Sequence, residues 1–244
     1  MQVALAVVVM NRPGPLCLST LWLVAGCSIS PVPEPPVTPP TLDTTVGVAA
    51  CATCDAPFIL QGAPGAVRDG TRIWAVNLDQ TTPPVIADVA ADGSYKLAMI
   101  GESGNEVRLQ ARRDDVRSTP VDVVLGNDSP LKNASRPFAD CFRVITDLDF
   151  GLQSPGSKVT RSITLTQSCA APLTVSRIAL RAPSAALTFV APSTPLVLAS
   201  GAPLSIDVSY SASSGSTDEE VLLVETSAPS KDRRAIDLAG RAAP

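Results

Sequence analysis

The chain of 244 residues contains no histidine, and its aromatic residues amount to two tryptophans, two tyrosines and five phenylalanines. Histidine is the commonest general base and metal ligand in proteins, so its absence removes whole classes of catalytic mechanism. No catalytic residue, metal site or cofactor motif stands out in what remains. The sequence therefore predicts a protein that is not an enzyme.

Clusters of basic residues are also missing. The chain has 19 Lys and Arg against 23 Asp and Glu, which gives a formal net charge of −4. A protein that binds phosphate backbones needs a positive patch, often with aromatic residues between the charges. We expect no nucleic acid among the partners.

Several adjacent pairs carry groups capable of catalysis, but their spacing does not favour it. The serine–lysine pairs at 157–158 and 230–231 point to opposite faces of an extended strand. The carboxylate pairs at 114–115 and 219–220 fall in segments that we expect to be exposed turns. Carboxylates in such turns mostly keep a loop hydrated.

The most specific motif is Val24-Ala25-Gly26-Cys27, which ends an apolar run over residues 16–25. A bacterial lipoprotein signal peptidase accepts such residues before the cysteine, and the run is shorter than the ~20 residues of a transmembrane helix. We expect residues 1–26 to be removed as a signal peptide and Cys27 to carry fatty acyl chains such as palmitate. The alternative is an ordinary secretory signal, with Cys27 free or in a disulfide.

The start of the signal peptide has one anomaly. Residues 1–9 carry no charge, whereas a signal peptide begins with a positive region. Met10 is followed by Asn11 and Arg12, so Met10 is the predicted start. Ser28 stands where an aspartate retains many lipoproteins at the inner membrane, and this favours the outer membrane of a cell envelope as the location.

Proline dominates the segment after the motif Val24-Ala25-Gly26-Cys27, which we call the lipobox. Residues 31–40 hold six prolines and prefer an extended polyproline II conformation of about 3.1 Å per residue. We interpret residues 27–45 as a tether between the anchor and the folded part. A proline-rich ligand for a recognition domain is the alternative.

Short apolar runs broken by Gly, Pro, Asp and Ser begin at about Val46 and predict an all-β fold. Apolar and polar residues alternate in 106–112, 162–166 and 204–210. Such alternation implies one buried face and one wet face, as in the antiparallel sheets of a sandwich. On 106–112, this places Val107, Leu109 and Ala111 in a core and the charged residues in water.

Turn-forming residues at 126–130 divide this region in two. We predict two immunoglobulin-like β-sandwich domains, over residues 46–125 and 138–244, joined by a linker over 126–137.

The first domain has a recognisable order of motifs. A strand over 72–78 follows Gly70-Thr71, an Asp92-Gly93-Ser94-Tyr95 turn follows, and a last strand ends in the segment 118–121. Asp92-Gly93 is a hairpin signal because glycine accepts the positive φ of a tight turn. This order resembles the bacterial Ig-like and carboxypeptidase-regulatory-like repeats of surface proteins, and the resemblance implies no catalytic role.

The second domain contains Leu148-Asp149-Phe150-Gly151, then Pro172-Leu173-Thr174-Val175, and closes with the segment 238–242. This order resembles bacterial Ig-like domains of the choice-of-anchor-D type, which are related to the ASH and major-sperm-protein-like sandwiches. Gln167-Ser168-Cys169 departs from the usual Asn-x-Gly turn of that type. The resemblance implies a protein-interaction or structural scaffold.

Four cysteines remain after Cys17 in the signal and Cys27 at the anchor: Cys51, Cys54, Cys141 and Cys169. An even number in an exported chain favours disulfides, and four cysteines allow three pairings. Cys141 lies just ahead of the first strand of the second domain and Cys169 lies in the altered turn, so a Cys141–Cys169 bridge is the predicted pairing. Cys51 and Cys54 would then pair locally or remain reactive.

These observations favour a cell-envelope lipoprotein that binds or scaffolds, with the membrane as one partner and an envelope protein or polysaccharide as another. One alternative is a thiol–disulfide protein that uses Cys51 and Cys54. The other is a carbohydrate or cell-wall binder, which would need exposed rings at Trp74 or Tyr95. We expect both rings to pack in or beside the first core.

Overall fold

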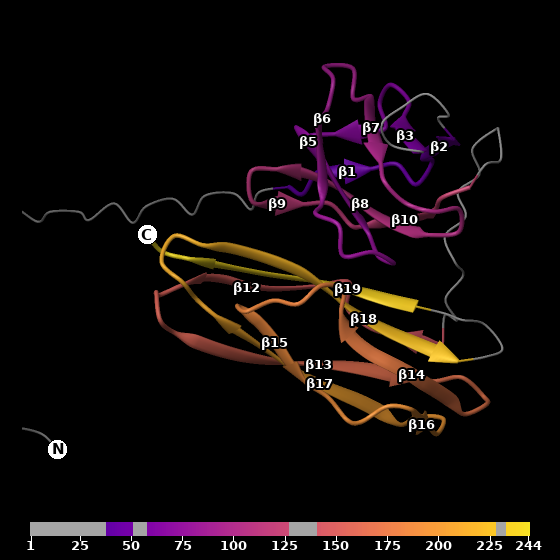
Figure 1. The fold of residues 1–244 in the computed structure, drawn as a ribbon, viewed down its shortest axis with the longest axis vertical. Coiled ribbons are helices and arrows are strands. Elements are labelled where there is room, and N and C mark those ends of the chain that lie inside the picture. The colour runs from indigo at the N-terminus through magenta and orange to yellow at the C-terminus, as the bar shows by residue number, and fades with distance from the viewer. Residues whose placement is uncertain (1–37, 51–57, 127–140, 228–232) are drawn as a thin grey trace, which may run out of the picture. The chain divides into compact units, whose positions relative to one another are not determined.

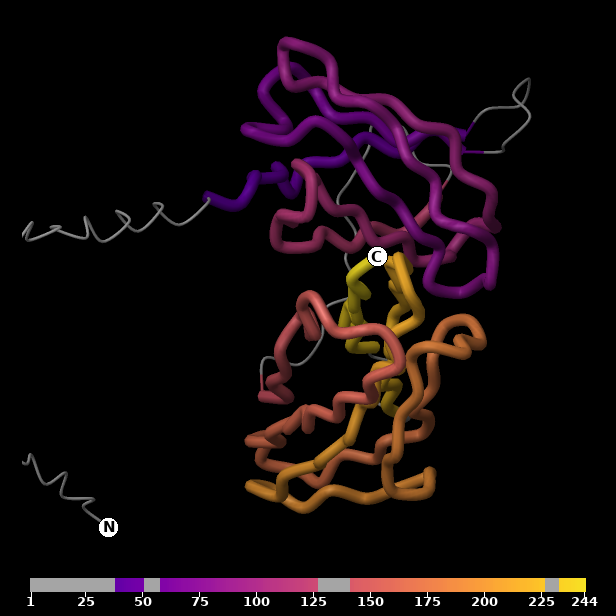
Figure 2. Tube along the Cα trace, turned by 90° about the vertical axis from the view of Figure 1, so that its left-hand side faces the viewer, coloured from indigo at the N-terminus to yellow at the C-terminus, as the bar shows by residue number. Residues whose placement is uncertain are grey.

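The computed structural model describes residues 38–50, 58–126, 141–227 and 233–244, and every helix or strand in these ranges is a β-strand (Figure 1). The predicted all-β class is confirmed. Since these ranges contain no helix, none of their residues forms a helix long and apolar enough to cross a membrane. Figures 1 and 2 show two bodies, one coloured indigo to magenta and one orange to yellow, which are two immunoglobulin-like β-sandwiches.

The first sandwich consists of two facing sheets, in the orders β2-β3-β7 and β10-β8-β5-β6. The first, second and fifth main strands share one sheet, and the third, fourth, sixth and seventh share the other, whereas the constant-type immunoglobulin arrangement places the fourth strand in the first of these sheets. The strands are β1 (Thr41–Leu42), β2 (Gly47–Ala50), β3 (Phe58–Gly62), β4 (Val67–Arg68), β5 (Arg72–Asn77), β6 (Val85–Asp88), β7 (Tyr95–Met99), β8 (Glu106–Arg113), β9 (Val116–Arg117) and β10 (Val121–Val124).

The core of the first sandwich is made by alternate residues of these strands, among them Leu60, Ile73, Leu97, Val107 and Leu109. On β8, Val107, Leu109 and Ala111 point into this core, as the alternation predicts.

Residues 38–45, at the end of the predicted tether, lie along this sandwich. β1 pairs antiparallel with β4, and the amide of Asp43 donates to the carbonyl of Ala66. Pro40 is buried, and the Arg113 guanidinium donates to the carbonyl of Thr38 at 2.8 Å. The chain therefore enters the folded part before Val46.

The Asp92-Gly93 turn is tight, but it does not form a hairpin. Gly93 has a φ of 81°, and the Ser94 amide donates to the Asp92 carboxylate. The strand before the turn, β6, pairs with β5, whereas the strand after it, β7, pairs with β3 of the other sheet. The hairpin prediction is therefore wrong, because the turn carries the chain from one layer of the sandwich to the other.

The second sandwich has sheets in the orders β11-β13-β17-β15 and β12-β19-β18-β14-β16. Its first strand is split between the layers, since β11 pairs with β13 and β12 pairs in parallel with β19. The strands are β11 (Phe142–Arg143), β12 (Asp147–Gln153), β13 (Lys158–Gln167), β14 (Leu173–Leu180), β15 (Leu187–Val190), β16 (Leu196–Leu198), β17 (Pro203–Ser211), β18 (Thr217–Ser227) and β19 (Arg233–Ala242).

The core of the second sandwich confirms the alternation predicted for residues 162–166 and 204–210, because Ile163, Leu165, Ile206 and Tyr210 all point into it. The Tyr210 ring also packs on the backbone of β19. A Cβ added to Gly240 would lie 2.5 Å from the ring, so only glycine fits there.

The predicted Cys141–Cys169 disulfide is present in the second sandwich, with the two Cα atoms 4.8 Å apart. The two cysteines flank the pairing of Phe142 with Gln167, and the Ser168 amide donates to the Cys141 carbonyl. The bridge thus fastens the short strand β11 to the end of β13. It closes a loop with a sequence separation of 28 residues.

Replacing both Cys141 and Cys169 by serine should lower the free energy of unfolding by about 3–4 kcal/mol, the entropy expected for a loop of this length. Urea unfolding measures this change in free energy. The comparison is made in a Cys51→Ser/Cys54→Ser background, so that reductant acts on the Cys141–Cys169 bridge alone. Reductant should destabilise the background protein to the level of the four-serine protein and leave the latter unchanged. Free thiols at both positions in the native protein would contradict the bridge.

Candidate functional site

The cysteines singled out by the sequence do not gather into one site in the described residues. Cys27, Cys51 and Cys54 lie outside those residues, so their predicted roles stay predictions. Cys141 and Cys169 are consumed by the disulfide. Across the described ranges, no group of three or more Cys, Asp or Glu residues is placed to hold a metal ion.

A third buried cluster, separate from the two cores, joins the two sandwiches, and we call this contact the joint. On β5, Ile73 and Ala75 point into the first core, while Trp74 and Val76 point the other way. They meet Val221 and Leu223 of β18, whose neighbours Leu222 and Val224 fill the second core. Leu78 and Ala235 complete the apolar set of the joint, which is Trp74, Val76, Leu78, Val221, Leu223 and Ala235.

These strands are apolar on both faces because each face has a sheet packed on it. Burying one such side chain contributes about 1.5–3 kcal/mol.

The polar face of β8 lies in the joint as well. Glu106, Arg108 and Gln110 are each at most 3% exposed. The prediction of a wet face on 106–112 is therefore wrong for these residues. The cause is tertiary, because β18 and β19 of the second sandwich cover the face that the first sandwich leaves open.

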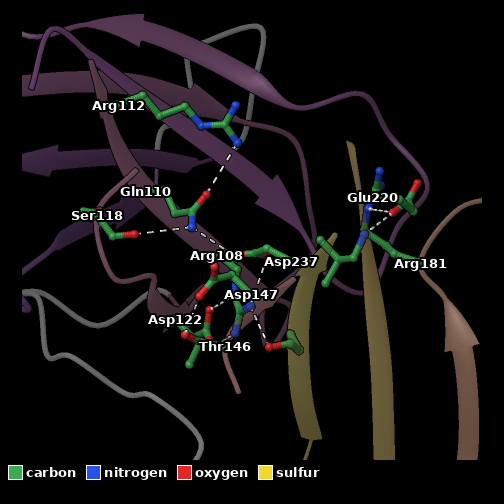
Figure 3. Close-up of polar contacts among 12 residues, drawn as sticks. Arg108, Gln110, Arg112, Ser118, Asp122, Thr146, Asp147, Arg181, Glu220 and Asp237 are labelled. Atoms are coloured by element: carbon green, nitrogen blue, oxygen red, sulfur yellow. Dashed lines mark hydrogen bonds and ion pairs between the residues drawn. The ribbon is translucent and has the colours of Figure 1, made fainter. Parts of the chain in front are cut away.

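Arg108 is the central cation of the joint (Figure 3). Its Nε and Nη2 donate to the two carboxylate oxygens of Asp122 on β10, each at 2.7 Å. Its Nη1 crosses to β19, where it donates to the carbonyl of Ala235 at 2.7 Å and to Asp237 Oδ1 at 3.1 Å. Gln110 donates to the other oxygen of Asp237 at 2.9 Å. Both oxygens of Asp237 are thus bonded to side chains of the first sandwich.

The charges in this cluster hold one another in place. Burial lowers the pKa of Arg108, but the carboxylates of Asp122 and Asp237 outweigh burial and raise it, so the guanidinium stays charged. Burial raises the pKa of Asp237, and Arg108 opposes that rise only in part. A charge in this position is stable only while its partners remain beside it.

Glu219 is a second crossing point. It accepts from Arg112 Nη1 at 2.8 Å and from Arg117 Nη2 at 2.6 Å, and both arginines belong to the first sandwich. Its neighbour Glu220 is buried and pairs with Arg181 at 3.1 Å. The prediction that Glu219 and Glu220 lie in an exposed turn is wrong, because both are in β18.

The other carboxylate pair, Asp114–Asp115, does lie in a turn, between β8 and β9, and it is exposed. Asp115 pairs with Arg241 of β19. The joint is further bordered by Arg233, which pairs with Asp79 at 2.6 Å, and by Arg181, whose Nη1 donates to the carbonyls of Gln80 and Thr82. Each sandwich therefore contributes arginines whose acceptors lie on the other sandwich.

The two aromatic candidates for sugar binding are buried. Tyr95 is 4% exposed in the first core, and Trp74 is 5% exposed in the joint, where the Arg112 guanidinium lies 4.4 Å from its ring centre. Both rings thus pack in or beside the first core, as expected. Neither offers the exposed ring that a sugar platform requires.

An open pocket of about 400 Å³ lies at the edge of the joint. It is lined by Thr71, Arg72, Trp74, Ile86, Asp88, Arg112 and Asp114. The Thr71 hydroxyl donates to a backbone carbonyl, and the lining holds two guanidinium and two carboxylate groups, with no base beside a nucleophile. The pocket can accommodate a polar ligand, but it lacks the arrangement of a nucleophilic catalyst.

No protein-family model and no curated protein matches this chain. Among solved structures, it is similar to the ASH/PapD-like domain 7 of human CEP192, with 13% identity over 48% of this chain and 96% of that one, at a TM-score of 0.36. The Vibrio cholerae VesB protease shows 15% identity over 74% of this chain and 65% of its own, at 0.37. A protein of unknown function from Porphyromonas gingivalis W83 shows 12% identity over 84% of this chain and 100% of its own, at 0.35. Likenesses this distant carry no argument about function.

Two strands of the joint, β18 and β19, can be recognised in the sequence by apolar runs, which the alternation of apolar and polar residues does not reveal. Residues 221–224 read Val-Leu-Leu-Val, and 235–239 read Ala-Ile-Asp-Leu-Ala, so apolar residues occupy consecutive positions in both strands, on either side of Asp237 in the second. Consecutive apolar residues in a strand indicate burial on both faces. Together with the arginines of β8, they would have pointed to a covered sheet.

Replacing Arg108 by methionine should lower the free energy of unfolding by about 3–5 kcal/mol, because it leaves Asp237 buried without its cation. Urea unfolding of the purified protein measures this. Arg72→Met is the matched control: Arg72 pairs with Asp88 at 3.8 Å in an exposed position, so its loss should change stability by about 0–1 kcal/mol. Equal effects of the two substitutions would mean that the joint is not closed in solution.

Proposed function

We propose that this chain is a lipid-anchored protein of the cell envelope that works as a non-catalytic binding or scaffolding module. Three parts support the proposal: the lipobox cysteine Cys27, the proline-rich segment after it, and the paired sandwiches. The lipobox and the prolines rest on the sequence, and they lie outside the described residues except for the end of the segment at 38–45.

The joint is the observation that carries the scaffolding role. Residues Val37–Pro244 form one compact unit, although they contain two sandwiches with separate cores. Two sandwiches on a loose linker would sample many relative orientations. Here buried ion pairs and an apolar patch hold them together, so that loops and edges of both sandwiches are presented in a constant geometry.

The alternatives receive less support from the described residues. A sugar platform on Trp74 or Tyr95 is covered by other side chains. The thiol–disulfide alternative depends on Cys51 and Cys54, and nothing in the described residues favours it.

Replacing Cys27 by serine should abolish incorporation of labelled palmitate, because serine offers no thiol for the lipid. Cys17→Ser is the matched control, since Cys17 lies ten positions earlier, in the apolar run that precedes Cys27. It should leave incorporation unchanged. Incorporation of the label by Cys27→Ser would contradict the anchor.

Crosslinking in intact cells, followed by mass spectrometry, tests the binding role. We expect discrete envelope components to be captured by the native protein and lost when Arg108→Met opens the joint. The Cys51→Ser/Cys54→Ser protein should capture the same components. Loss of capture in that cysteine variant alone would favour the thiol–disulfide alternative instead.

A further inference from the structure

A long uncharged segment forms an open edge of the second sandwich. Residues 182–206 contain no Asp, Glu, Lys or Arg, and they include β15 (Leu187–Val190). β15 pairs with β17 on one side and ends its sheet, so that none of the described strands pairs with its other side. Natural edge strands commonly carry charges that prevent pairing with another chain. β15 has no such protection.

Most other edges of the described sheets do have a charged residue. These charged edge strands are β6 with Asp88, β7 with Lys96, β10 with Asp122, β11 with Arg143, and β12 with Asp147 and Asp149. The edge strand β2 is uncharged, but Gly47 and Val48 are buried. β16 is uncharged and only three residues long, and it follows Pro195. β15 therefore stands apart as an uncharged edge of four residues with exposed side chains.

The backbone of β15 is placed to accept another strand. The Ser211 amide donates to the Ala186 carbonyl, which makes this a hydrogen-bonded pair of the β15–β17 ladder. Hydrogen-bonded and non-hydrogen-bonded pairs alternate along an antiparallel ladder, so the backbone N–H and C=O groups of Thr188 and Val190 bond to β17. Phe189 lies between them and directs its N–H and C=O groups toward the open side. Leu187 does the same, although its N–H already donates to the Ser184 hydroxyl at 3.0 Å.

The side chains of β15 suit an identical partner. Thr188 is exposed and Val190 is 73% exposed on the outer face, while Phe189 is half-buried against the core. If two copies of β15 lie antiparallel with Phe189 opposite Phe189, then Thr188 of each copy lies opposite Val190 of the other. Aromatic and β-branched pairs of this kind stabilise sheets.

We propose that β15 pairs with β15 of a second copy of this chain, about a two-fold axis through Phe189, so that two four-stranded sheets become one continuous sheet. The chain carries a net charge of −4, which opposes close approach of two copies over most of their surfaces. The β15 edge brings no charge of its own into the contact. The cross-strand neighbour Asp207 is one strand further in, on β17, where it accepts from the Ser162 hydroxyl.

A pairing of four residues is weak by itself, and a high local concentration strengthens it. An anchor that confines the chain to a membrane surface provides that concentration. This part of the argument rests on the proposed lipid anchor, whereas the pairing geometry does not.

A pair of cysteines tests the register. In the full-length protein in its own membrane, Thr188→Cys combined with Val190→Cys should form disulfide-linked dimers under mild oxidation, because opposed positions of this kind lie about 4.5 Å apart at Cα. The matched control is Ile86→Cys with Asp88→Cys, which has the same spacing on the exposed edge strand β6. We expect about tenfold more dimer from the β15 pair than from the control.

A charged substitution on β15 tests the pairing of two copies without introducing cysteines. Thr188→Lys should reduce the co-purification of two differently tagged copies about tenfold, because it places like charges across the two-fold axis. Thr164→Lys is the control, since Thr164 is exposed on β13 in the interior of the same sheet. It should leave co-purification unchanged.

Two results would overturn the proposal: a β15 cysteine pair that crosslinks no better than the β6 pair, or one that crosslinks to a protein of another mass. If the protein is found outside the membrane but still forms the β15-linked dimer, then the anchor is wrong and the pairing stands. If it is in the membrane without that dimer, the anchor stands and the pairing is wrong.

Discussion

The relative placement of the two sandwiches depends on the ion cluster around Arg108. A guanidinium that is 3% exposed must have all its charge compensated locally, and Asp122, Asp237 and the Ala235 carbonyl do this from two different sandwiches. The apolar patch around Trp74 and Leu223 stabilises the contact but does not fix the relative orientation of the sandwiches, because hydrophobic contacts are not directional. The ion pairs supply the direction. A rotation of one sandwich that kept the patch dry would still separate Arg108 from Asp237.

Much of the fold could be predicted from the alternation of residues along the chain. Ile163, Leu165, Ile206 and Tyr210 point inward as the pattern indicates, and the Cys141–Cys169 bridge is the pairing predicted from Cys141 ahead of the first strand of the second domain and Cys169 in the altered turn. Alternation does not tell what covers the polar face. On β8 it separates Val107 from Arg108 correctly, but only the second sandwich decides that Arg108 is buried.

The errors have a common physical origin. Asp92-Gly93 specifies a sharp reversal of the chain, and local chemistry is the same whether the next strand joins the same sheet or the opposite one. Glu219 and Glu220 look like surface residues because charged residues are rarely buried alone. Each is in fact paired with arginines that are distant in sequence, and no local pattern contains such a partner. The lipid and thiol predictions at Cys27, Cys51 and Cys54 concern residues that the structure does not describe.

The charge pattern of the joint also has a consequence for how such chains diversify. In many tandem proteins an immunoglobulin-like unit can be duplicated, lost or exchanged for another, because each unit is soluble by itself. Here Arg112 and Arg117 have their acceptor in the second half, while Arg233 and Arg241 each pair with a carboxylate of the first half besides one of their own half. Either half, transplanted alone, would expose Trp74 or Val221 and carry charges without partners. We therefore expect the two halves to be inherited together and to change by coordinated substitutions across the joint.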